Sequence, residues 1–526
     1  MKRGGLVLMV ALCALLLCAC QQAAAPAEPQ GNASGYPIAP EKLTLTAMQF
    51  ELDNQAIDFG NLWFYQQLEE KTNIHIEFDE VKQADWGTKL NLMFASGDYR
   101  DMVLRGSLDL EEYGVGQQLL LPLDDVMARN MPIYTQRVAD ANLAADLRSS
   151  DGHTYSIGFL ISQGVNTNGH FFINQNWLSR LGLSMPATVD ELTDVLRAFR
   201  DGDTNGNGLS DEVPYQATFG DNNNGVYNAF AFFGVPMNEY YICVGDDGHV
   251  YFPVMRDGFR QCVEWLHLLC EEKLLDMECI TQGSNLWGAK VNQNTAGLFT
   301  YWRLGNSTLK SEIAEQFTCM LPVAAEGRTP CVSRIMDTID FGASLTVANE
   351  HVDESLRWLD AQFDTETMMV SQNGPVGDML FVGEDGKYQV AYIPQENELY
   401  SIVPVICGQS FAPSNYYRQV YVPAAHRLEK IRYSEQYEQA DVMEKVSFQV
   451  LTSVAHKTEG QSKRITDLFN TLKNQINASL VEFLTQGVTD ENWQAFLTEL
   501  DNIGWREYVS LYQQVYDTYR RGVAAS

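Results

Sequence analysis

The segment from Leu43 to Phe78 restricts the fold more than any other part of the chain. Residues 43–50, LTLTAMQF, alternate as a β-strand does, and residues 61–73, NLWFYQQLEEKTN, carry apolar side chains at helical spacing. A second strand pattern, IHIEF, follows at residues 74–78. A strand, a helix and a strand in such close succession predict a parallel βαβ unit. The chain is therefore expected to build an α/β fold.

The next segment repeats this pattern. Residues 86–104, WGTKLNLMFASGDYRDMVL, predict a helix followed by a strand. Gly97 follows the last helical residue, Ser96, and glycine readily takes the left-handed conformation that closes a helix. We therefore expect the helix to end at Ser96 and a third strand to begin near Asp101.

Size and charge limit the class of protein. The chain has 526 residues, of which 45% are apolar, which is enough for at least two domains. Its net charge of −32 argues against nucleic acid or anionic lipid as the main partner. Seven cysteines follow residue 20, with no CxxC pair, and their odd number cannot pair completely, so we interpret most as small buried hydrophobes. They are Cys243, Cys262, Cys270, Cys279, Cys319, Cys331 and Cys407.

The N-terminus has the pattern of a secretory signal. Lys2 and Arg3 precede an apolar run at residues 6–17 that is too short to span a bilayer. The order Leu-Cys-Ala-Cys at residues 17–20 resembles the bacterial lipobox, which implies cleavage after residue 19 and attachment of diacylglycerol, with palmitate-type acyl chains, to Cys20. Residues 20–40 have the composition of a flexible linker. We expect residues 1–19 to be removed and the mature protein to sit, lipid-anchored, on the extracytoplasmic face of the cell membrane.

Several phrases along the chain resemble one protein family. FASGDYRDMV at residues 94–103 resembles the phrase ASGDxPD of extracellular solute-binding proteins of bacterial ABC importers, with Arg100 in place of the usual proline. The segments at residues 119–127, 151–158, 264–282 and 482–519 resemble later landmarks of its oligosaccharide-binding members, in the same order. The resemblance implies a class II periplasmic-binding-protein fold, in which two α/β lobes, each a mixed sheet flanked by helices, meet at a hinge. The predicted lobes are residues 41–166 with 318–370, and residues 167–317 with 371–526.

The resemblance also implies a function. A protein of this family captures an oligosaccharide in the cleft between its lobes and delivers it to the transmembrane subunits of an ABC permease. We expect a monomeric binder rather than an enzyme, because the sequence contains no HExxH, GxSxG or GxxxxGK motif. A peptide remains the main alternative cargo. An accessory sensor for a membrane kinase and a lipid-anchored glycan-acting enzyme are further alternatives.

Residues 201–212, DGDTNGNGLSDE, predict a calcium site, because carboxylates and carboxamides alternate around Gly206. A capping box at residues 188–191 begins the helix that leads into this loop, and Pro214 opposes a second helix after it. A single helix indicates a structural ion rather than a sensor. An EF-hand alignment gives the ligands Asp201, Asp203, Asn205, Asn207, the Leu209 carbonyl and Glu212. The family resemblance instead implies Asp203, Asn205, Asn207, the Leu209 carbonyl, Asp211 and Glu212, and we favour this second set.

Aromatic residues, which make up 11% of the chain, indicate where a sugar could bind. Sugar rings pack on aromatic faces, while their hydroxyls need paired donors and acceptors. Trp302 ends the strand pattern TAGLFTYW, which resembles the strand that places a sugar-stacking Trp in maltose-type binding proteins. The predicted ligand-binding residues are Trp302, Trp287, Asp98, Arg303, Tyr416 and Tyr417.

Overall fold

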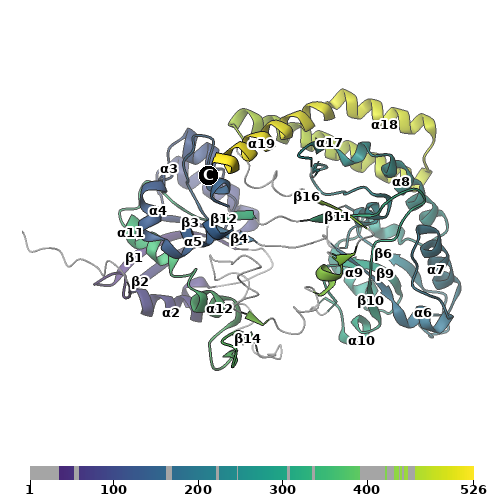
Figure 1. The fold of residues 1–526 in the computed structure, drawn as a ribbon, viewed down its shortest axis with the longest axis horizontal. Helices are drawn as coiled ribbons and strands as arrows, with labels where there is room; N and C mark the ends of the chain where they lie inside the picture. Colours follow the sequence, from purple (N-terminus) through teal and green to yellow (C-terminus); the bar gives the residue numbers. More distant parts are fainter. Residues whose placement is uncertain are drawn as a thin grey trace, which may run out of the picture.

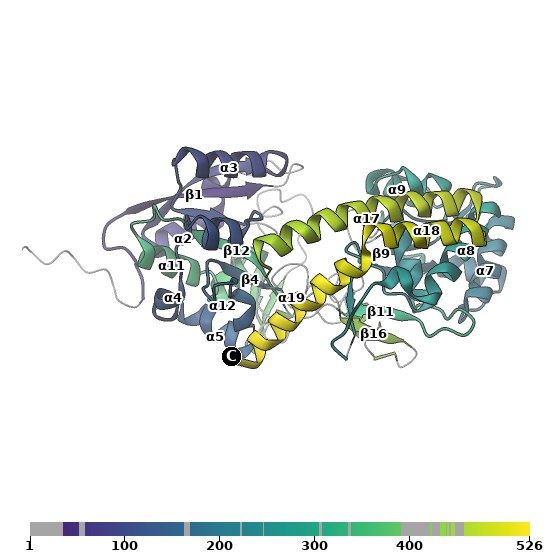
Figure 2. The same ribbon diagram turned by 90° about the horizontal axis from the view of Figure 1, so that it is seen from above.

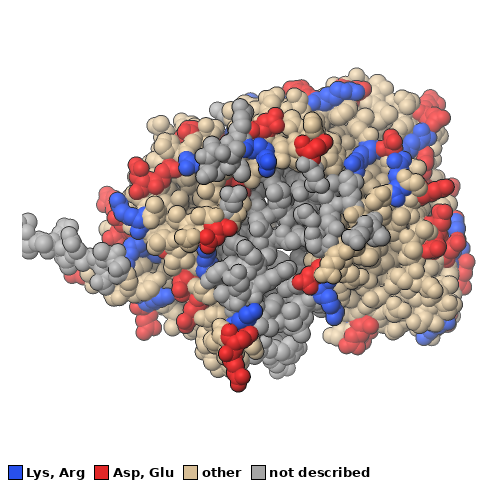
Figure 3. Space-filling model, viewed as in Figure 1, with Lys and Arg blue, Asp and Glu red and all other residues tan. Residues whose placement is uncertain are grey.

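The computed structural model shows two lobes joined by several chain crossings (Figure 1). It describes residues 35–525 apart from residues 52–57, 142, 162–168, 221–223, 246, 305–307, 335–337, 391–420, 423–431, 438, 441–442 and 448–456. Acidic and basic side chains are intermixed over the described surface of both lobes in the view of Figure 3. The predicted signal sequence, Cys20, Cys407, Tyr416 and Tyr417 lie outside the described residues.

The first lobe contains a five-stranded sheet in the order β2-β1-β3-β12-β4. Strand β1 (Leu43–Glu51) pairs in parallel with both β2 (Ile74–Lys82) and β3 (Met102–Leu104). Strand β12 (Thr338–Leu345) is antiparallel to β3 and to β4 (Ile157–Ile161). The parallel pairing of β1 and β2 around one helix confirms the predicted βαβ unit.

Helices cover this first sheet. Helix α3 ends at Ser96, and Gly97 closes it with a φ of 76°, as predicted. Side chains from β1, β3 and α11 meet in one core, among them Leu45, Leu104 and Trp358. The helical elements of the lobe are η1 (Phe59–Asn61), α2 (Trp63–Thr72), η2 (Gln83–Asp85), α3 (Trp86–Ser96), η3 (Glu111–Gly116), α4 (Asp124–Asn130), α5 (Pro132–Asp140), η4 (Ala144–Leu147), α11 (Val352–Asp360) and α12 (Thr365–Asn373).

The second lobe contains a four-stranded sheet in the order β10-β5-β9-β6. Strand β5 (His170–Asn174) is antiparallel to β9 (Ala296–Tyr301) and to β10 (Phe317–Met320), and β6 (Val213–Gln216) is parallel to β9. The predicted boundary at residue 318 is wrong, because it falls inside β10 and would separate this strand from its partner β5. The chain returns to the first sheet only at β12.

The remaining elements complete the second lobe and the region beside α12. The helical elements are η5 (Val226–Phe233), η6 (Pro253–Met255), η7 (Met277–Ile280), α6 (Gln175–Leu181), α7 (Val189–Asp201), α8 (Asp257–Glu271), α9 (Ser284–Val291) and α10 (Ser311–Ala314). A second sheet has the order β11 (Cys331–Arg334), β16 (Glu444–Ser447), β7 (Cys243–Val244) and β8 (Val250–Tyr251). A third consists of β13 (Leu380–Val382), β14 (Tyr388–Val390) and β15 (Tyr421–Val422). The six described cysteines are free thiols, and all six are buried, as predicted for most of them.

Three long C-terminal helices pack on the second lobe. Helices α17 (Glu459–Gln486) and α18 (Asp490–Ile503) share one apolar core with α7 and α8. Helix α19 (Trp505–Ala525) begins in the second lobe and runs back to the first (Figure 2). There it contacts η4. No helix within the described residues is long and apolar enough to cross a membrane.

Candidate functional site

Strand directions identify the edges at which the two lobes face each other. The chain leaves the first sheet at the end of β4 and enters the second at His170, the start of β5. Tyr301, the last residue of β9, pairs with His170, so the carboxyl end of β9 lies at the same edge. Strand β6 is parallel to β9 and also ends there. In open α/β sheets ligands bind outside the carboxyl ends of strands, which makes this edge the candidate site.

Uncharged polar groups collect at this edge of the second lobe. Asn228 Nδ2 donates to Thr300 Oγ1 over 3.0 Å and to the Gly225 carbonyl over 2.9 Å. Nearby, Asn224 Oδ1 accepts hydrogen bonds from Thr218 Oγ1 at 3.3 Å and from Ser284 Oγ at 3.4 Å. Hydroxyls and carboxamides both donate and accept, so this arrangement suits a ligand rich in hydroxyl groups.

A recess lies beside these polar groups. Asn228 and Tyr227 of η5 contribute polar groups to it, while the start of β5 and the strand β11 supply apolar surface. Its lining residues include Gly169, Phe171, Tyr227, Asn228, Cys331 and Val332. Both β5 and β11 adjoin segments at which the chain crosses between lobes, so the recess is at the hinge side of the candidate site.

The predicted aromatic residues take different places. Trp302 directly follows β9 and is partly exposed, and the Arg303 guanidinium carbon lies 4.4 Å from the centre of its ring. Trp287 is completely buried, is stacked on Tyr301 at a ring separation of 5.0 Å, and donates from Nε1 to the Gln216 carbonyl over 3.3 Å. The structure therefore brings Trp302 and Arg303 to the candidate site. Trp287 instead supports Tyr301 from within the core, which corrects its assignment as a ligand contact.

Asp98 lies away from this site. Strands β3 and β4 are both antiparallel to β12 and so run in the same direction, which places the carboxyl end of β3 at the edge facing the second lobe. Asp98 precedes the amino end of β3, and its side chain is 79% exposed and forms an ion pair of 3.4 Å with Arg100. The expectation that Asp98 and Trp302 share one cleft is therefore not met. The sequence around Asp98 predicts where helix α3 ends, but it does not predict the direction of the strand β3 that follows.

Sequence reasoning missed the groups at the facing edge of the first lobe. The buried Glu51 at the end of β1 forms an ion pair of 2.7 Å with Lys82 at the end of β2. After β3 the chain turns at Gly106, where an added Cβ would lie 2.0 Å from the indole of Trp86. These residues lie at the ends of β1, β2 and β3, which are far apart in the sequence. They come together only because the three strands are neighbours in the sheet.

The helix before the predicted calcium loop is confirmed. Thr188 caps α7 by accepting from Glu191 N at 3.2 Å. The Glu191 carboxylate accepts from Ala187 N at 2.7 Å, so the reciprocal bond of the predicted capping box shifts by one residue. One apolar face of this helix is buried, namely Val189, Leu192, Val195, Leu196 and Phe199. Strand β6 begins directly after the loop, which confirms that no second helix follows it.

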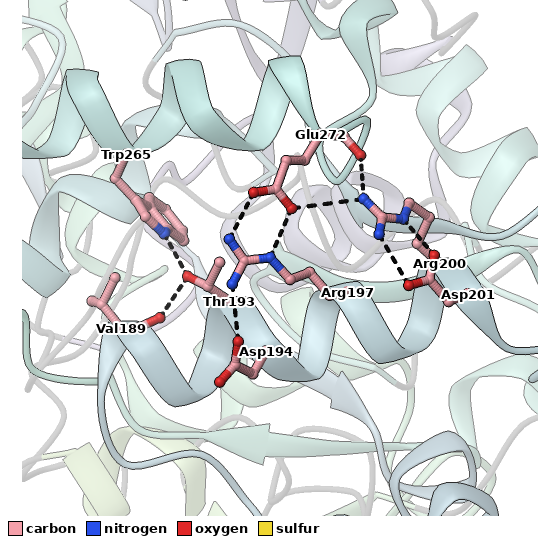
Figure 4. A network of polar contacts seen from close by, with 8 residues as sticks. All are labelled: Val189, Thr193, Asp194, Arg197, Arg200, Asp201, Trp265 and Glu272. Atoms are coloured by element: carbon pink, nitrogen blue, oxygen red, sulfur yellow. Dashed lines mark hydrogen bonds and ion pairs between the residues drawn. The ribbon is translucent and has the colours of Figure 1, made fainter.

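Asp201 is turned away from the loop. Its carboxylate accepts from Arg200 Nε at 2.7 Å and Nη2 at 3.0 Å, and this ion pair lowers the pKa of Asp201. Arg200 Nη1 in turn donates to the carbonyl of Glu272, whose carboxylate binds Arg197 through two hydrogen bonds of 2.6 and 2.7 Å (Figure 4). This network joins α7 to the end of α8. The EF-hand ligand set, which requires Asp201, therefore fits the structure less well than the set with Asp211.

The side chains of the loop bind one another. Asn205 Nδ2 donates to Asp211 over 2.9 Å, and Asn207 Nδ2 donates to both Asp211 oxygens at 3.0 and 3.1 Å. Gly206 has a φ of 77°, which favours glycine at this turn. If the carboxamide groups of Asn205 and Asn207 were each turned over, their oxygens would take the places of their nitrogens. The Asp211 carboxylate would then lose these two donors and be available to a cation.

Glu212 is the loop group that most nearly fits a cation. It is buried, and its Oε1 accepts from Thr204 N at 2.8 Å. Its Oε2 has no hydrogen-bond partner among the described residues, although a buried carboxylate oxygen is costly to leave unsatisfied. A hard cation would satisfy it. The described side chains nevertheless contain no group of three or more His, Cys, Asp or Glu residues arranged to hold a metal ion.

The fold and the polar edge define a two-lobe solute-binding protein. Residues 59–239 match the model of the bacterial extracellular solute-binding protein family. It is similar to the fructooligosaccharide ABC transporter substrate-binding protein FusA of Streptococcus pneumoniae, with 26% identity over 99% of this chain and 98% of FusA. It is also similar to lipoprotein LipO of Bacillus subtilis, with 22% identity over 59% of this chain and 62% of LipO.

A solved structure shows the same fold. The FusA EF-hand mutant of Streptococcus pneumoniae, in complex with fructo-nystose, superposes with a TM-score of 0.75 at 24% identity, covering 91% of this chain and 99% of that one. The agreement over nearly the whole length confirms the predicted α/β fold of two lobes.

Proposed function

We propose that this protein captures an oligosaccharide between its lobes and delivers it to an ABC permease. The observation that carries the proposal is the cluster of uncharged donors and acceptors beside Trp302 at the carboxyl edge of β6 and β9. The full-length similarity to the fructooligosaccharide-binding protein FusA supports it. Members of this family are substrate-binding proteins, so we expect binding without turnover.

The chemistry of the edge favours a neutral sugar. The half-buried Asn228 offers hydrogen bonds without a formal charge, and its bond to the buried Thr300 holds its orientation. Trp302 offers an aromatic ring, and the adjacent Arg303 guanidinium at 4.4 Å helps to hold its orientation. A sugar presents C–H groups to such a ring and hydroxyls to the amides, whereas a peptide would need its backbone amides paired along an extended line.

We further propose that Cys20 carries the lipid anchor and that the mature chain works on the extracytoplasmic face of the membrane. The lipobox pattern at residues 17–20 supports this, as does the similarity to a lipoprotein. A tether of this kind would keep the binding lobes near the permease.

We propose a structural calcium ion in the loop that links α7 to β6. The buried, unpartnered Glu212 Oε2 supports this proposal. One solved structure of FusA is that of an EF-hand mutant, and an EF-hand is a calcium-binding loop, which supports a calcium site in a similar protein. The ligands would be the side chains of Asp203, Asn205, Asn207, Asp211 and Glu212 with the carbonyl of Leu209. The ion would supply positive charge to the three carboxylates and fix the loop.

A thermal-shift screen tests the proposed cargo class. The protein starting at residue 21 would be heated with neutral oligosaccharides, with acidic oligosaccharides and with short peptides at equal concentration. A ligand that binds only the folded state raises the melting temperature, so neutral oligosaccharides should give the largest shift. Shifts from peptides alone would reject the carbohydrate proposal and favour the alternative cargo.

A further inference from the structure

Helix α19 is fixed to the second lobe along its first half. Tyr508 donates from its hydroxyl to the Tyr240 carbonyl over 2.8 Å. Gln513 donates to the Gly248 carbonyl over 3.1 Å and accepts from Val250 N at 2.7 Å. These contacts hold α19 to the backbone of β8 and of the segment before it. The first half of α19 therefore moves with the second lobe.

The other half of α19 reaches the first lobe. Tyr519 is buried and forms a side-chain hydrogen bond with Asp146 of η4. Asp146 is only 5% exposed, and its Oδ1 has no hydrogen-bond partner among the described residues. Figure 2 shows α19 running from the second lobe to the first. Because η4 belongs to the first lobe and α19 is held by the second, this hydrogen bond crosses between lobes.

Lys457, just before α17, interacts electrostatically with the first lobe. Lys457 lies just before this helix, and its ammonium group is 5.8 Å from the ring centre of Tyr512 on α19. Burial lowers the pKa of Lys457, and the opposite charge of Asp109, which belongs to the first lobe, acts against that shift. The charges of Asp109 and Lys457 thus add an attraction between the first lobe and the segment before α17.

We propose that the Asp146–Tyr519 contact is a proton-dependent clasp that ties α19 to the first lobe and restricts the hinge. Any change in the angle between lobes must either preserve this buried hydrogen bond or break it, because its two partners belong to different lobes. The clasp does not depend on the identity of the ligand, so it stands apart from the oligosaccharide proposal.

The electrostatics of Asp146 determine the direction of the effect. Burial raises the pKa of Asp146 to about 7, against the hydrogen bond from Tyr519, which lowers it. Tyr134 of α5 also interacts with the Asp146 charge, and Arg520 and Tyr516 act on Tyr519 from within α19. The carboxyl is therefore neutral in the closed clasp at mildly acidic pH.

Proton linkage determines whether the clasp becomes more or less stable as the pH rises. When the clasp opens, Asp146 regains an ordinary pKa near 3.9, so the open form releases its proton at lower pH than the closed form. The clasp is fully stable below about pH 4, and it weakens by up to about tenfold for each pH unit between about 4 and 7. Above the folded-state value of about 7 the carboxyl is charged in both forms, and no further change is expected.

Hydrogen exchange of the ligand-free protein tests the clasp. We would compare peptides covering residues 143–148 and 515–520 at pH 5, 6, 7 and 8, after correcting for the intrinsic exchange rate at each pH. The protection of the amides in these two peptides against exchange should fall between pH 5 and 7 and should stay constant above pH 7. Peptides covering the first turns of α19 serve as an internal reference, because contacts to the second lobe hold that half of the helix.

Two variants separate the clasp from a general loss of stability. Asp146→Asn cannot ionise and should keep high protection at every pH, while the exposed Asp140→Asn should behave as the wild type. Tyr519→Phe removes the hydrogen bond that lowers the Asp146 pKa, so the loss of amide protection should occur at higher pH in this variant than in the wild type. This variant also tests the clasp if Asp146→Asn fails to fold. Protection that is independent of pH in the wild type, or equally dependent in Asp146→Asn, would overturn the proposal.

Discussion

Replacing Trp302 with alanine should weaken ligand binding while leaving most of the folding stability intact. The indole is partly exposed at the end of β9, and the ring of Tyr301 lies 6.4 Å from it at an angle of 73°. A sugar ring that covers about 40–120 Å² of apolar surface contributes about 1–3 kcal/mol at roughly 25 cal/mol per Å². The dissociation constant should therefore rise about 5- to 150-fold, as measured by isothermal titration with the best ligand of the screen.

Trp287→Ala is the matched control for this substitution. Its indole is fully buried against Tyr301 and Phe299 and bonds to the Gln216 carbonyl, so truncation should cost about 3–5 kcal/mol of folding free energy. Urea unfolding measures both variants. The reasoning is refuted if Trp302→Ala loses as much stability as Trp287→Ala, or if its folded fraction binds ligand with wild-type affinity.

Three further substitutions test other parts of the structure. Glu212→Gln should abolish the rise in melting temperature on adding calcium to chelator-treated protein, whereas Asp201→Asn should retain it; an equal rise in both variants would reject the proposed ligand set. Cys20→Ala should move the protein from the detergent phase to the aqueous phase when extracts of expressing cells are partitioned between detergent and water, and unchanged partitioning would disprove lipid attachment. Gly106→Ala should lower the free energy of unfolding by about 1–3 kcal/mol through overpacking, while Gly87→Ala, which meets no neighbouring atom, should not, as urea unfolding would show.

The local parts of the fold could be predicted from sequence because short-range physics fixes them. The alternation in β1 and β2, the cap at Gly97 and the apolar face of α7 each depend on residues within a few positions of one another. The loop after α7 was likewise predictable, since Pro214 cannot continue a helix.

The site was predictable only in part, because it depends on long-range pairing. Strand β10 belongs to the second lobe through its bonds with β5, which no local pattern reveals. Trp287 and Trp302 look alike in the sequence, yet the packing of α9 against β9 buries the first and leaves the second at the edge. Asp98 was predicted to bind ligand from the residues next to it in the sequence, whereas its actual position follows from the direction of β3.

The central claim is that the facing edges of the two lobes bind a neutral oligosaccharide. Isothermal titration of the calcium-loaded protein, starting at residue 21, with a panel of neutral oligosaccharides tests it most directly. We predict saturable binding of at least one oligosaccharide with a stoichiometry of one, and no heat from peptides of similar size. Saturable binding of peptides, with none of the oligosaccharides binding, would contradict the account.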